Sequence, residues 1–298
     1  MTSKIINKIH KNRPQLSDSS LKTYGSILKS LYKDMYDDVE SDDDIDLEKF
    51  NDNKKVLSHL KPLEVNKRKT LLSALFVLTE NKAYRKQMVD DINKYDIQQQ
   101  KQEKTEAQKD SWLDTHEIKN IIENLEKHVK LIYKHDALTM QDLQDIQDYV
   151  LLCCVSGIYI PPRRSMDFCD FKIKNINKDE DNYLNKNELI FNSYKTSKVY
   201  GQQSVKIPRK MSILLKKWIG VNPTDYLFFD KNKNPMTNVK LNQRLNKLFG
   251  QKSSVNALRH TFLTDKYLEH SEKEKELKED TTKMGTSIHQ AFHNYIKV

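Results

Sequence analysis

Glycine and cysteine are scarce in this chain, and each shortage excludes a kind of site. The six glycines form no glycine-rich phosphate loop, and the sequence contains no HExxH motif. Cys153, Cys154 and Cys169 are odd in number, two are adjacent, and none has the spacing of metal ligands, so we expect buried, reduced thiols. The sequence therefore predicts no nucleotide, no metal and no other cofactor.

Long apolar runs are absent as well. No stretch approaches the roughly 18 apolar residues of a membrane span, and the N-terminus has no apolar signal core. A charged content of 31% beside 37% hydrophobic residues is typical of a helical protein with broad solvated faces. We expect a protein that is neither secreted nor membrane-bound and that acts in the cytoplasm, or in the nucleus if its host has one.

Arginine is the scarce member of the basic residues. The net charge is +9, and only eight of the 51 lysines and arginines are arginine. A basic chain favours a polyanionic partner. Lysine acts as a point charge, whereas the planar arginine fork matches two phosphate oxygens, so the few arginines are the first candidates for a site.

The apolar pattern predicts a mainly α protein with a small antiparallel β-sheet, an α+β fold in two domains. Residues 1–98 show four helical segments and an acidic break at 40–46, which indicates a helical N-terminal domain. Residues 99–110 are polar and lack apolar periodicity, as expected of a linker. Residues 111–298 form the second domain. Its strands are expected near 168–176, 188–193 and 203–207, and its later helices at 211–219, 238–249 and 255–268.

Four residues of the second domain stand in an order that is typical of one chemistry. They are Arg164, Lys195, Arg259 and Tyr295, separated by 31 (164 to 195), 64 (195 to 259) and 36 (259 to 295) residues. This order resembles the tyrosine recombinase, or phage-integrase, family. The resemblance covers the whole chain and implies that the first domain is a core-binding domain that contacts DNA and that the second is catalytic.

Arg164 matches the first arginine box of that family. In the family an acidic residue lies three positions beyond the arginine, and Asp167 satisfies this offset, so we prefer Arg164 to its neighbour Arg163. The Ile-Pro-Pro insertion at 160–162 departs from the common bacterial form. It is similar to integrases of large eukaryotic DNA viruses and their mobile elements, for which the nucleus or a viral factory would be the site of action.

Lys195 and Arg259 match the next two boxes. The segment around Lys195 resembles the lysine turn between the second and third strands; Lys198 is the runner-up, and an ordinary solvated lysine is the alternative in so lysine-rich a chain. The segment around Arg259 resembles the second arginine box. There Asn256 stands where the family usually has histidine, and an amide can hydrogen-bond a phosphate oxygen but cannot transfer a proton.

The C-terminal segment resembles the last boxes. Thr286 stands where histidine or tryptophan is usual, and Tyr295 follows it by nine residues (286 to 295), the family's offset to its nucleophile. Three histidines are candidates to compensate for the two replaced positions: His260, His289 and His293. For His260 a structural role is an equal alternative.

The resemblance also implies an activity and partners. The expected function is site-specific recombination or integration of double-stranded DNA through a 3′-phosphotyrosyl intermediate, by a homotetramer on two DNA sites and without a small-molecule substrate. The two arginines would stabilise the transition state at the phosphate. Lys195 would protonate the leaving 5′ oxygen, and Tyr295 would be the nucleophile. Two alternatives stay open: a type IB topoisomerase-like enzyme, which shares this chemistry, and a catalytically lapsed DNA-binding protein, which the two replaced positions favour.

Overall fold

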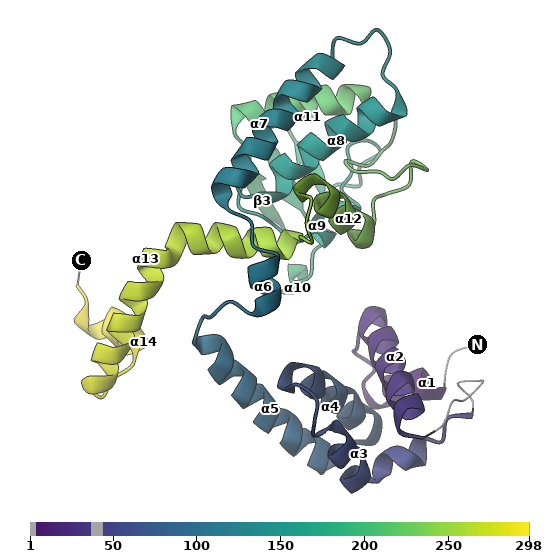
Figure 1. Ribbon diagram of the computed structural model, residues 1–298, viewed down its shortest axis with the longest axis vertical. Coiled ribbons are helices and arrows are strands. Elements are labelled where there is room, and N and C mark those ends of the chain that lie inside the picture. Colours follow the sequence, from purple (N-terminus) through teal and green to yellow (C-terminus); the bar gives the residue numbers. More distant parts are fainter. Residues whose placement is uncertain (1–3, 37–43, 298) are drawn as a thin grey trace. The chain divides into compact units, whose positions relative to one another are not determined.

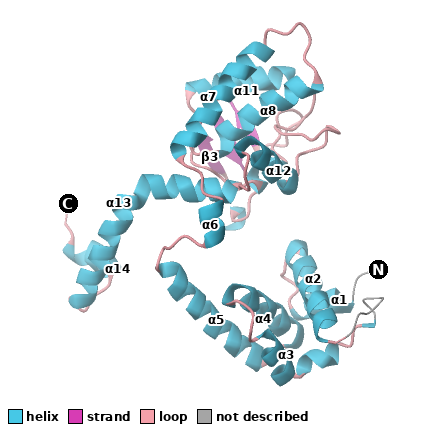
Figure 2. Cartoon of the chain, viewed as in Figure 1, coloured by secondary structure: helices cyan, strands magenta, loops and turns pink. Residues whose placement is uncertain are grey.

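The computed structural model describes residues 4–36 and 44–297 (Figure 1). The chain divides into two compact units, Met1–Glu103 and Lys104–Val298. Helices dominate both units, and the three described strands lie in the second (Figure 2). The predicted fold class, mainly α with a small antiparallel sheet, is confirmed. No helix within the described ranges is both long and apolar enough to cross a membrane.

The first unit is a packed group of short helices. They are α1 (Lys4–Asn12), α2 (Asp18–Met35), the 3-10 helix η2 (Leu47–Asn51), α3 (Asn53–Leu60), α4 (Val65–Thr79) and α5 (Lys82–Gln100). Side chains of Ser17, Asp52 and Asn81 accept backbone N–H bonds and so begin α2, α3 and α5. The sequence pattern predicts four helices in this unit, and α1 is an additional one. Its apolar pattern is short, since only Ile5 and Ile9 of its nine residues are buried. The acidic break expected at 40–46 lies largely outside the described residues.

A buried ion pair joins α4 to α5 in this unit. Arg68 donates from Nε and Nη2 to the two carboxylate oxygens of Asp91 at 2.6 and 2.7 Å, and Gln87 donates to one of them at 3.0 Å. The Asp91 side chain is 0% exposed. Burial alone would raise the pKa of Asp91, but the hydrogen bonds from Arg68 and Gln87 outweigh it and hold the pKa below its ordinary value of 3.8.

The second unit combines helices with one small sheet. The helices are α6 (Glu106–Asp110), α7 (Thr115–Ile132), α8 (Met140–Val155), α9 (Met166–Cys169), α10 (Ser197–Tyr200), α11 (Arg209–Val221), α12 (Asn238–Phe249), α13 (Val255–Lys283), α14 (Ile288–Gln290) and the π-helix η3 (Ala291–Tyr295). The strands β1 (Tyr183–Asn185), β2 (Glu188–Phe191) and β3 (Gln203–Lys206) form an antiparallel sheet in the order β1-β2-β3. Leu189 pairs with both Leu184 and Val205 and fixes the register.

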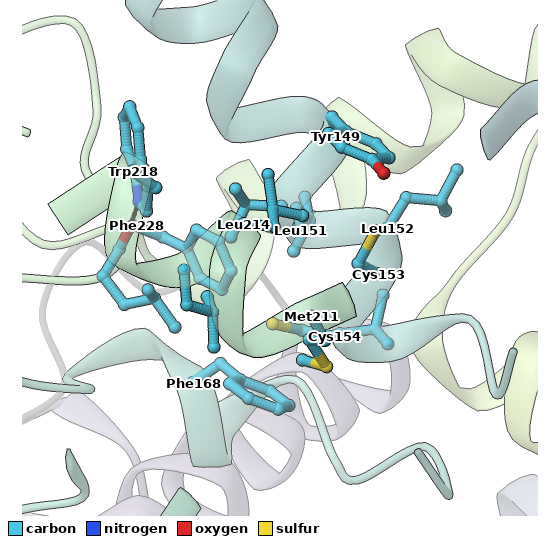
Figure 3. Close-up of a cluster of buried hydrophobic side chains, with 14 of the residues drawn as sticks. Tyr149, Leu151, Leu152, Cys153, Cys154, Phe168, Met211, Leu214, Trp218 and Phe228 are labelled. Atoms are coloured by element: carbon cyan, nitrogen blue, oxygen red, sulfur yellow. Dashed lines mark hydrogen bonds between the residues drawn. The ribbon is translucent and has the colours of Figure 1, made fainter. Parts of the chain in front are cut away.

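The helix α8 is the centre of the second core. Eleven of its residues are buried, and α7, α11 and α12 pack against it. Figure 3 shows the buried side chains that α8 shares with α9, α11 and the segment before α12: Tyr149, Leu151, Leu152, Cys153, Cys154, Phe168, Met211, Leu214, Trp218 and Phe228. All three cysteines are buried and unpaired, as expected, and burial raises the pKa of Cys169 to about 11. The thiols are therefore part of the packing.

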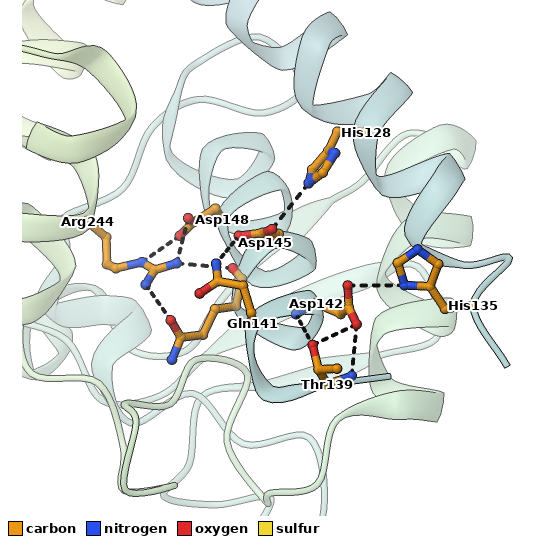
Figure 4. Close-up of polar contacts among 9 residues, drawn as sticks. His128, His135, Thr139, Gln141, Asp142, Asp145, Asp148 and Arg244 are labelled. Carbon is orange, nitrogen blue, oxygen red and sulfur yellow. Dashed lines mark hydrogen bonds and ion pairs between the residues drawn. The ribbon is translucent and has the colours of Figure 1, made fainter. Parts of the chain in front are cut away.

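Polar contacts fix the position of α8 among its neighbours (Figure 4). Arg244 of α12 donates to both carboxylate oxygens of Asp148, at 2.7 and 2.5 Å. At the start of α8, Thr139 and Asp142 form a capping box. These contacts therefore anchor α8 at its start and near its middle, and the segment with the candidate arginines follows its C-terminal end.

The strand predicted near 168–176 is wrong: this stretch holds isolated bridges from Lys172 to Tyr183 and Tyr226 but no strand. Phe168 and Phe171 are both fully buried. A strand would place residues three apart on opposite faces, whereas the helical turn α9, which holds Phe168, and the chain just after it, which holds Phe171, let both side chains enter one core. The first strand instead begins at Tyr183. The unit boundary after Glu103 falls within 99–110, where Thr105 and Gln108 form a capping box that begins α6.

We predict that Asp91→Asn lowers the free energy of unfolding at pH 7 by about 3 kcal/mol, because it leaves the Arg68 guanidinium buried without its charge partner. Because folding lowers the pKa of Asp91, the ionised carboxylate contributes fully to the free energy of unfolding above the pKa of the unfolded chain, which is about 4. That contribution is lost as the pH falls below this value. Urea unfolding from pH 7 to pH 2.5 measures both effects. An unchanged acid limb in Asp91→Asn would contradict the assignment.

Candidate active site

The structure brings Arg164 and Arg259 together, although they are 95 positions apart (164 to 259). Arg164 lies between the end of α8 and the start of α9, and Arg259 lies in the second turn of α13. Burial lowers the pKa of Arg259, and the positive charge of Arg164 lowers it further, while Asp167 opposes both. The charges of Arg164 and Asp167 therefore both act on Arg259.

Among the described residues, the guanidinium groups of Arg164 and Arg259 have no hydrogen-bonded partner. Both side chains are half-buried. Within the part of the chain that the structure describes, neither forms a side-chain hydrogen bond or an ion pair. A guanidinium has five N–H donors, so this pair offers donors that the described residues leave unused.

The neighbouring Arg163 is committed to the protein itself. Its Nε donates to Asp167 Oδ2 at 2.9 Å and its Nη1 donates to Gln203 Oε1 at 2.8 Å. Its guanidinium carbon lies 3.9 Å from the centre of the Phe191 ring and 4.9 Å from that of Tyr194. Hydrogen bonding and cation–π stacking together fix Arg163 between α9 and the sheet.

Asp167 is the acidic centre of this arginine cluster. Its side chain is 2% exposed. Burial raises its pKa, and the charges of Arg163, Arg164 and Arg259 act in the opposite direction. Its Oδ1 has no hydrogen-bond partner among the described residues. Three arginine charges act on one carboxylate, so the cluster carries an excess of positive charge and favours an anion.

Gly157 allows the two arginine-bearing segments to approach. It follows α8 with φ +88°, and a Cβ there would lie 2.8 Å from a ring carbon of Phe262 on α13. Only glycine fits this backbone conformation and this contact without strain. Gly157, Phe191 and Gln203 support the site, and none of the three is among the predicted site residues. The sequence could have pointed to Gly157, because a glycine is notable in a chain that has only six.

Lys195 lies where the sequence predicts it, in the turn between β2 and β3. Its side chain is exposed. The preceding Tyr194 donates from its hydroxyl to the Gly201 carbonyl at 2.7 Å, which closes the loop, and its ring faces Arg163. Lys198 is also exposed, on the short helix α10. Lys195 is therefore one residue away from a side chain that contacts the arginine cluster.

Asn256 and His260 lie on the first two turns of α13, beside Arg259. Both are exposed, and Asn256 Nδ2 lies 3.3 Å from His260 Nε2. Around a helix, residue 256 falls between residues 259 and 260. Asn256 therefore separates the arginine cluster from His260 on the helix surface.

Tyr295 is not brought to the arginines within this chain. It ends η3 with 63% of its surface exposed, and no hydrogen bond, ion pair or ring contact among the described residues joins it to Arg164, Lys195 or Arg259. The terminal segment instead packs on the far end of α13 (Figure 1), where Thr286 donates its backbone N–H to the Thr281 carbonyl at 2.8 Å.

The two C-terminal histidines lie on the same segment as Tyr295. The rings of His289 and His293 are 4.3 Å apart between centroids, and both side chains are exposed. Thr286 is half-buried at the preceding turn. Within the described ranges, no group of three or more histidine, cysteine or acidic side chains could hold a metal ion.

Comparisons with known proteins give only loose structural likenesses. No protein-family model and no curated protein matches the chain. A crystal structure of XerA recombinase shares 14% identity and a TM-score of 0.36 over 88% of this chain and 82% of that one. A lambda integrase dimer bound to a COC′ core site shares 12% identity and a TM-score of 0.46 over 90% of this chain and 71% of that one. Likenesses at this level do not establish a family.

We predict opposite stability effects at the two adjacent arginines. Arg163→Ala should lower the free energy of unfolding by about 3 kcal/mol, because Asp167 would stay buried without its hydrogen-bonded partner. Arg164→Ala, the matched control, should change it by less than about 0.5 kcal/mol, because that guanidinium forms no hydrogen bond or ion pair with the described residues. Urea unfolding at pH 7 compares them. Equal losses would show that the roles of the two side chains are misassigned.

Proposed function

We propose that this protein is a site-specific DNA recombinase or integrase of the tyrosine type, which cuts and rejoins double-stranded DNA through a 3′-phosphotyrosyl intermediate. The observation that carries this proposal is the convergence of the unoccupied guanidinium groups of Arg164 and Arg259 beside the buried Asp167. A DNA phosphate is the anion that fits two planar forks with an excess of positive charge.

The arginine pair supplies the electrostatic part of the reaction. Attack on the phosphate diester gives a five-coordinate transition state with more negative charge on its non-bridging oxygens. Two guanidinium groups at the phosphate bind that charge more strongly than they bind the ground state, which lowers the barrier. Asp167 and Arg163 hold the segment that carries Arg164 against the sheet, since their contact is buried and the Arg163 guanidinium stacks on Phe191.

Tyrosine and lysine supply the bond changes. The Tyr295 oxygen attacks phosphorus, the bond from phosphorus to the 5′ oxygen breaks, and Lys195 gives that oxygen a proton. The phenol loses its own proton to a base, for which His260, His289 and His293 are the candidates. Rejoining is the reverse step, with a 5′ hydroxyl of another strand as the nucleophile.

The position of Tyr295 sets a condition for this reaction. Its phenol must reach a phosphate bound at the arginines, by movement of the terminal segment or from another protomer of the expected homotetramer on two DNA sites. The exposed phenol and the small contact of η3 with the rest of the unit suit either route. The similarity to viral and mobile-element integrases, and with it a nuclear or viral-factory location, rests on the Ile-Pro-Pro insertion at 160–162 alone.

A catalytically lapsed DNA-binding protein is the second candidate. Two observations favour it: Asn256 stands at a position where the resemblance implies a proton-transferring histidine, and Tyr295 is separated from the arginines. Such a protein would use the same arginine cluster to bind a phosphate without cutting the strand.

We predict a covalent protein–DNA adduct in EDTA. The full-length protein is incubated with labelled, nicked suicide duplexes that cover the ends of its native element, and the products are resolved on a denaturing gel. Tyr295→Phe should abolish the adduct, whereas Tyr267→Phe, an exposed tyrosine on α13, should retain it. Arg164→Ala and Arg259→Ala should each slow adduct formation by about 10²–10³-fold.

Two outcomes would redirect the proposal. An adduct that survives Tyr295→Phe would assign the nucleophile to another residue. No adduct, with salt-sensitive binding of the same duplexes intact, would favour the lapsed DNA-binding protein.

A further inference from the structure

The loop between β2 and β3 closes on itself around the turn that carries Lys195. Ser197 donates its backbone N–H to the Tyr194 carbonyl at 3.0 Å, and Gly201 donates its N–H to the Ser197 carbonyl at 2.8 Å. The Tyr194 hydroxyl then donates across the loop to the Gly201 carbonyl at 2.7 Å. One half-buried tyrosine therefore holds both ends of a turn whose lysine is exposed.

The same tyrosine contacts the arginine cluster. The guanidinium carbon of Arg163 lies 4.9 Å from the centre of the Tyr194 ring and 3.9 Å from that of Phe191, and Arg163 Nη1 donates to Gln203 Oε1 at 2.8 Å. Phe191 ends β2, Gln203 begins β3, and the two are paired across the sheet. Arg163 therefore contacts the loop on both sides of its base, and Arg164 is the next residue along the chain.

Asn182 connects the loop to α9 independently of Arg163. Its buried amide donates to the Asp167 carbonyl at 2.9 Å and to the Ser193 carbonyl at 2.7 Å. Its Oδ1 accepts the backbone N–H groups of Asn192 and Ser193 at 2.9 and 2.8 Å. An amide side chain has two N–H donors and two acceptor lone pairs, so this side chain is fully used. The backbone that leads into Tyr194 is thus held against α9.

The Lys195 side chain has no comparable tie of its own. It is exposed, and with the described residues it forms no side-chain hydrogen bond or ion pair. Its ammonium carries the same sign of charge as the nearby arginines, and like charges repel. A turn without the Tyr194 contacts would therefore favour positions away from the arginine cluster.

We propose that Tyr194 is a positioning residue for proton transfer by Lys195. Its hydroxyl bond to Gly201 and its ring contact with Arg163 hold the lysine turn beside the arginines, so that lysine and arginines act on one phosphate. The acid role of Lys195 rests here on the proposed recombinase function.

The proton transfer is the step that depends on this position. As the Tyr295 oxygen bonds to phosphorus, the bond from phosphorus to the 5′ oxygen breaks. The Lys195 ammonium gives a proton to that oxygen and becomes a neutral amine. Such a transfer needs a contact of hydrogen-bond length, so a loosened turn slows it.

The first test compares two leaving groups in the covalent-adduct assay. One nicked suicide duplex has the ordinary 5′ oxygen at the cut phosphate, and the other has sulfur in its place, as a 5′-bridging phosphorothiolate. A thiolate is a far weaker base than an alkoxide and leaves without a proton. Tyr194→Phe keeps the ring and removes the hydroxyl. It should slow adduct formation on the oxygen duplex by about tenfold and leave the rate on the sulfur duplex unchanged.

Two further variants calibrate this comparison. Lys195→Ala should be about 10²–10⁴-fold slower on the oxygen duplex, the usual contribution of a general acid, and unchanged on the sulfur duplex. Tyr200→Phe is the matched control, because its exposed phenol lies in the same loop and forms no hydrogen bond with the described residues. It should keep the wild-type ratio of the two rates. Equal losses on both duplexes in Tyr194→Phe, or no loss on either, would overturn the positioning role.

Amide hydrogen exchange separates the role of Tyr194 from the recombinase function. Measured on the full-length protein without DNA, it reports how firmly residues 192–202 are held. Tyr194→Phe should exchange about tenfold faster in this segment, and Tyr200→Phe should not. Unchanged exchange in Tyr194→Phe would overturn the positioning role even where adducts form. A wild-type protein that forms no adduct with either duplex would instead overturn the recombinase function, while faster exchange in Tyr194→Phe would still show that this residue holds the turn.

Discussion

The burial of Asp167 among three arginines is the constraint on which the candidate site depends. A carboxylate that is 2% exposed is costly unless it is paired, and Arg163 pairs with it at 2.9 Å. That contact neutralises the charge of Asp167 with Arg163. The positive charges of Arg164 and Arg259 are therefore not balanced by a further acidic group in this cluster. The cluster is consequently held together by one acid yet left with positive charge in excess, which is the condition for binding an external anion.

The surrounding core keeps this charged cluster in place. α8 is buried along most of its length and is fixed by Arg244 through Asp148 near its middle. Just after its C-terminal end, Gly157 lets Phe262 of α13 pack closely, so the segment that carries Arg164 and the helix that carries Arg259 meet. Like charges repel, and it is the apolar packing around them that supplies the free energy to hold two guanidinium groups together.

Sequence reasoning predicted the fold class and the turn that holds Lys195, because helix periodicity and β-turn composition are local signals. The expectation that Arg164 and Arg259 act together came from the resemblance to a known family and from no local pattern. Sequence reasoning failed for the strand near 168–176, because alternation and helical spacing are hard to distinguish over so few apolar residues. The cation–π contacts of Arg163 depend on tertiary packing, which no local pattern contains. The distance of Tyr295 from the arginines likewise depends on where a terminal segment packs.

The central claim is that Arg164 and Arg259 act on one phosphate, and a double-mutant cycle tests it most directly. The rate of adduct formation is measured for the wild-type protein, Arg164→Ala, Arg259→Ala and the double variant under one salt condition. Two groups that act as a unit give losses that are far from additive, so we expect the double variant to be no more than about tenfold slower than the slower single variant. A double variant slowed by the full product of the two single losses, about 10⁴–10⁶-fold, would show that the arginines act independently and would contradict a shared phosphate site.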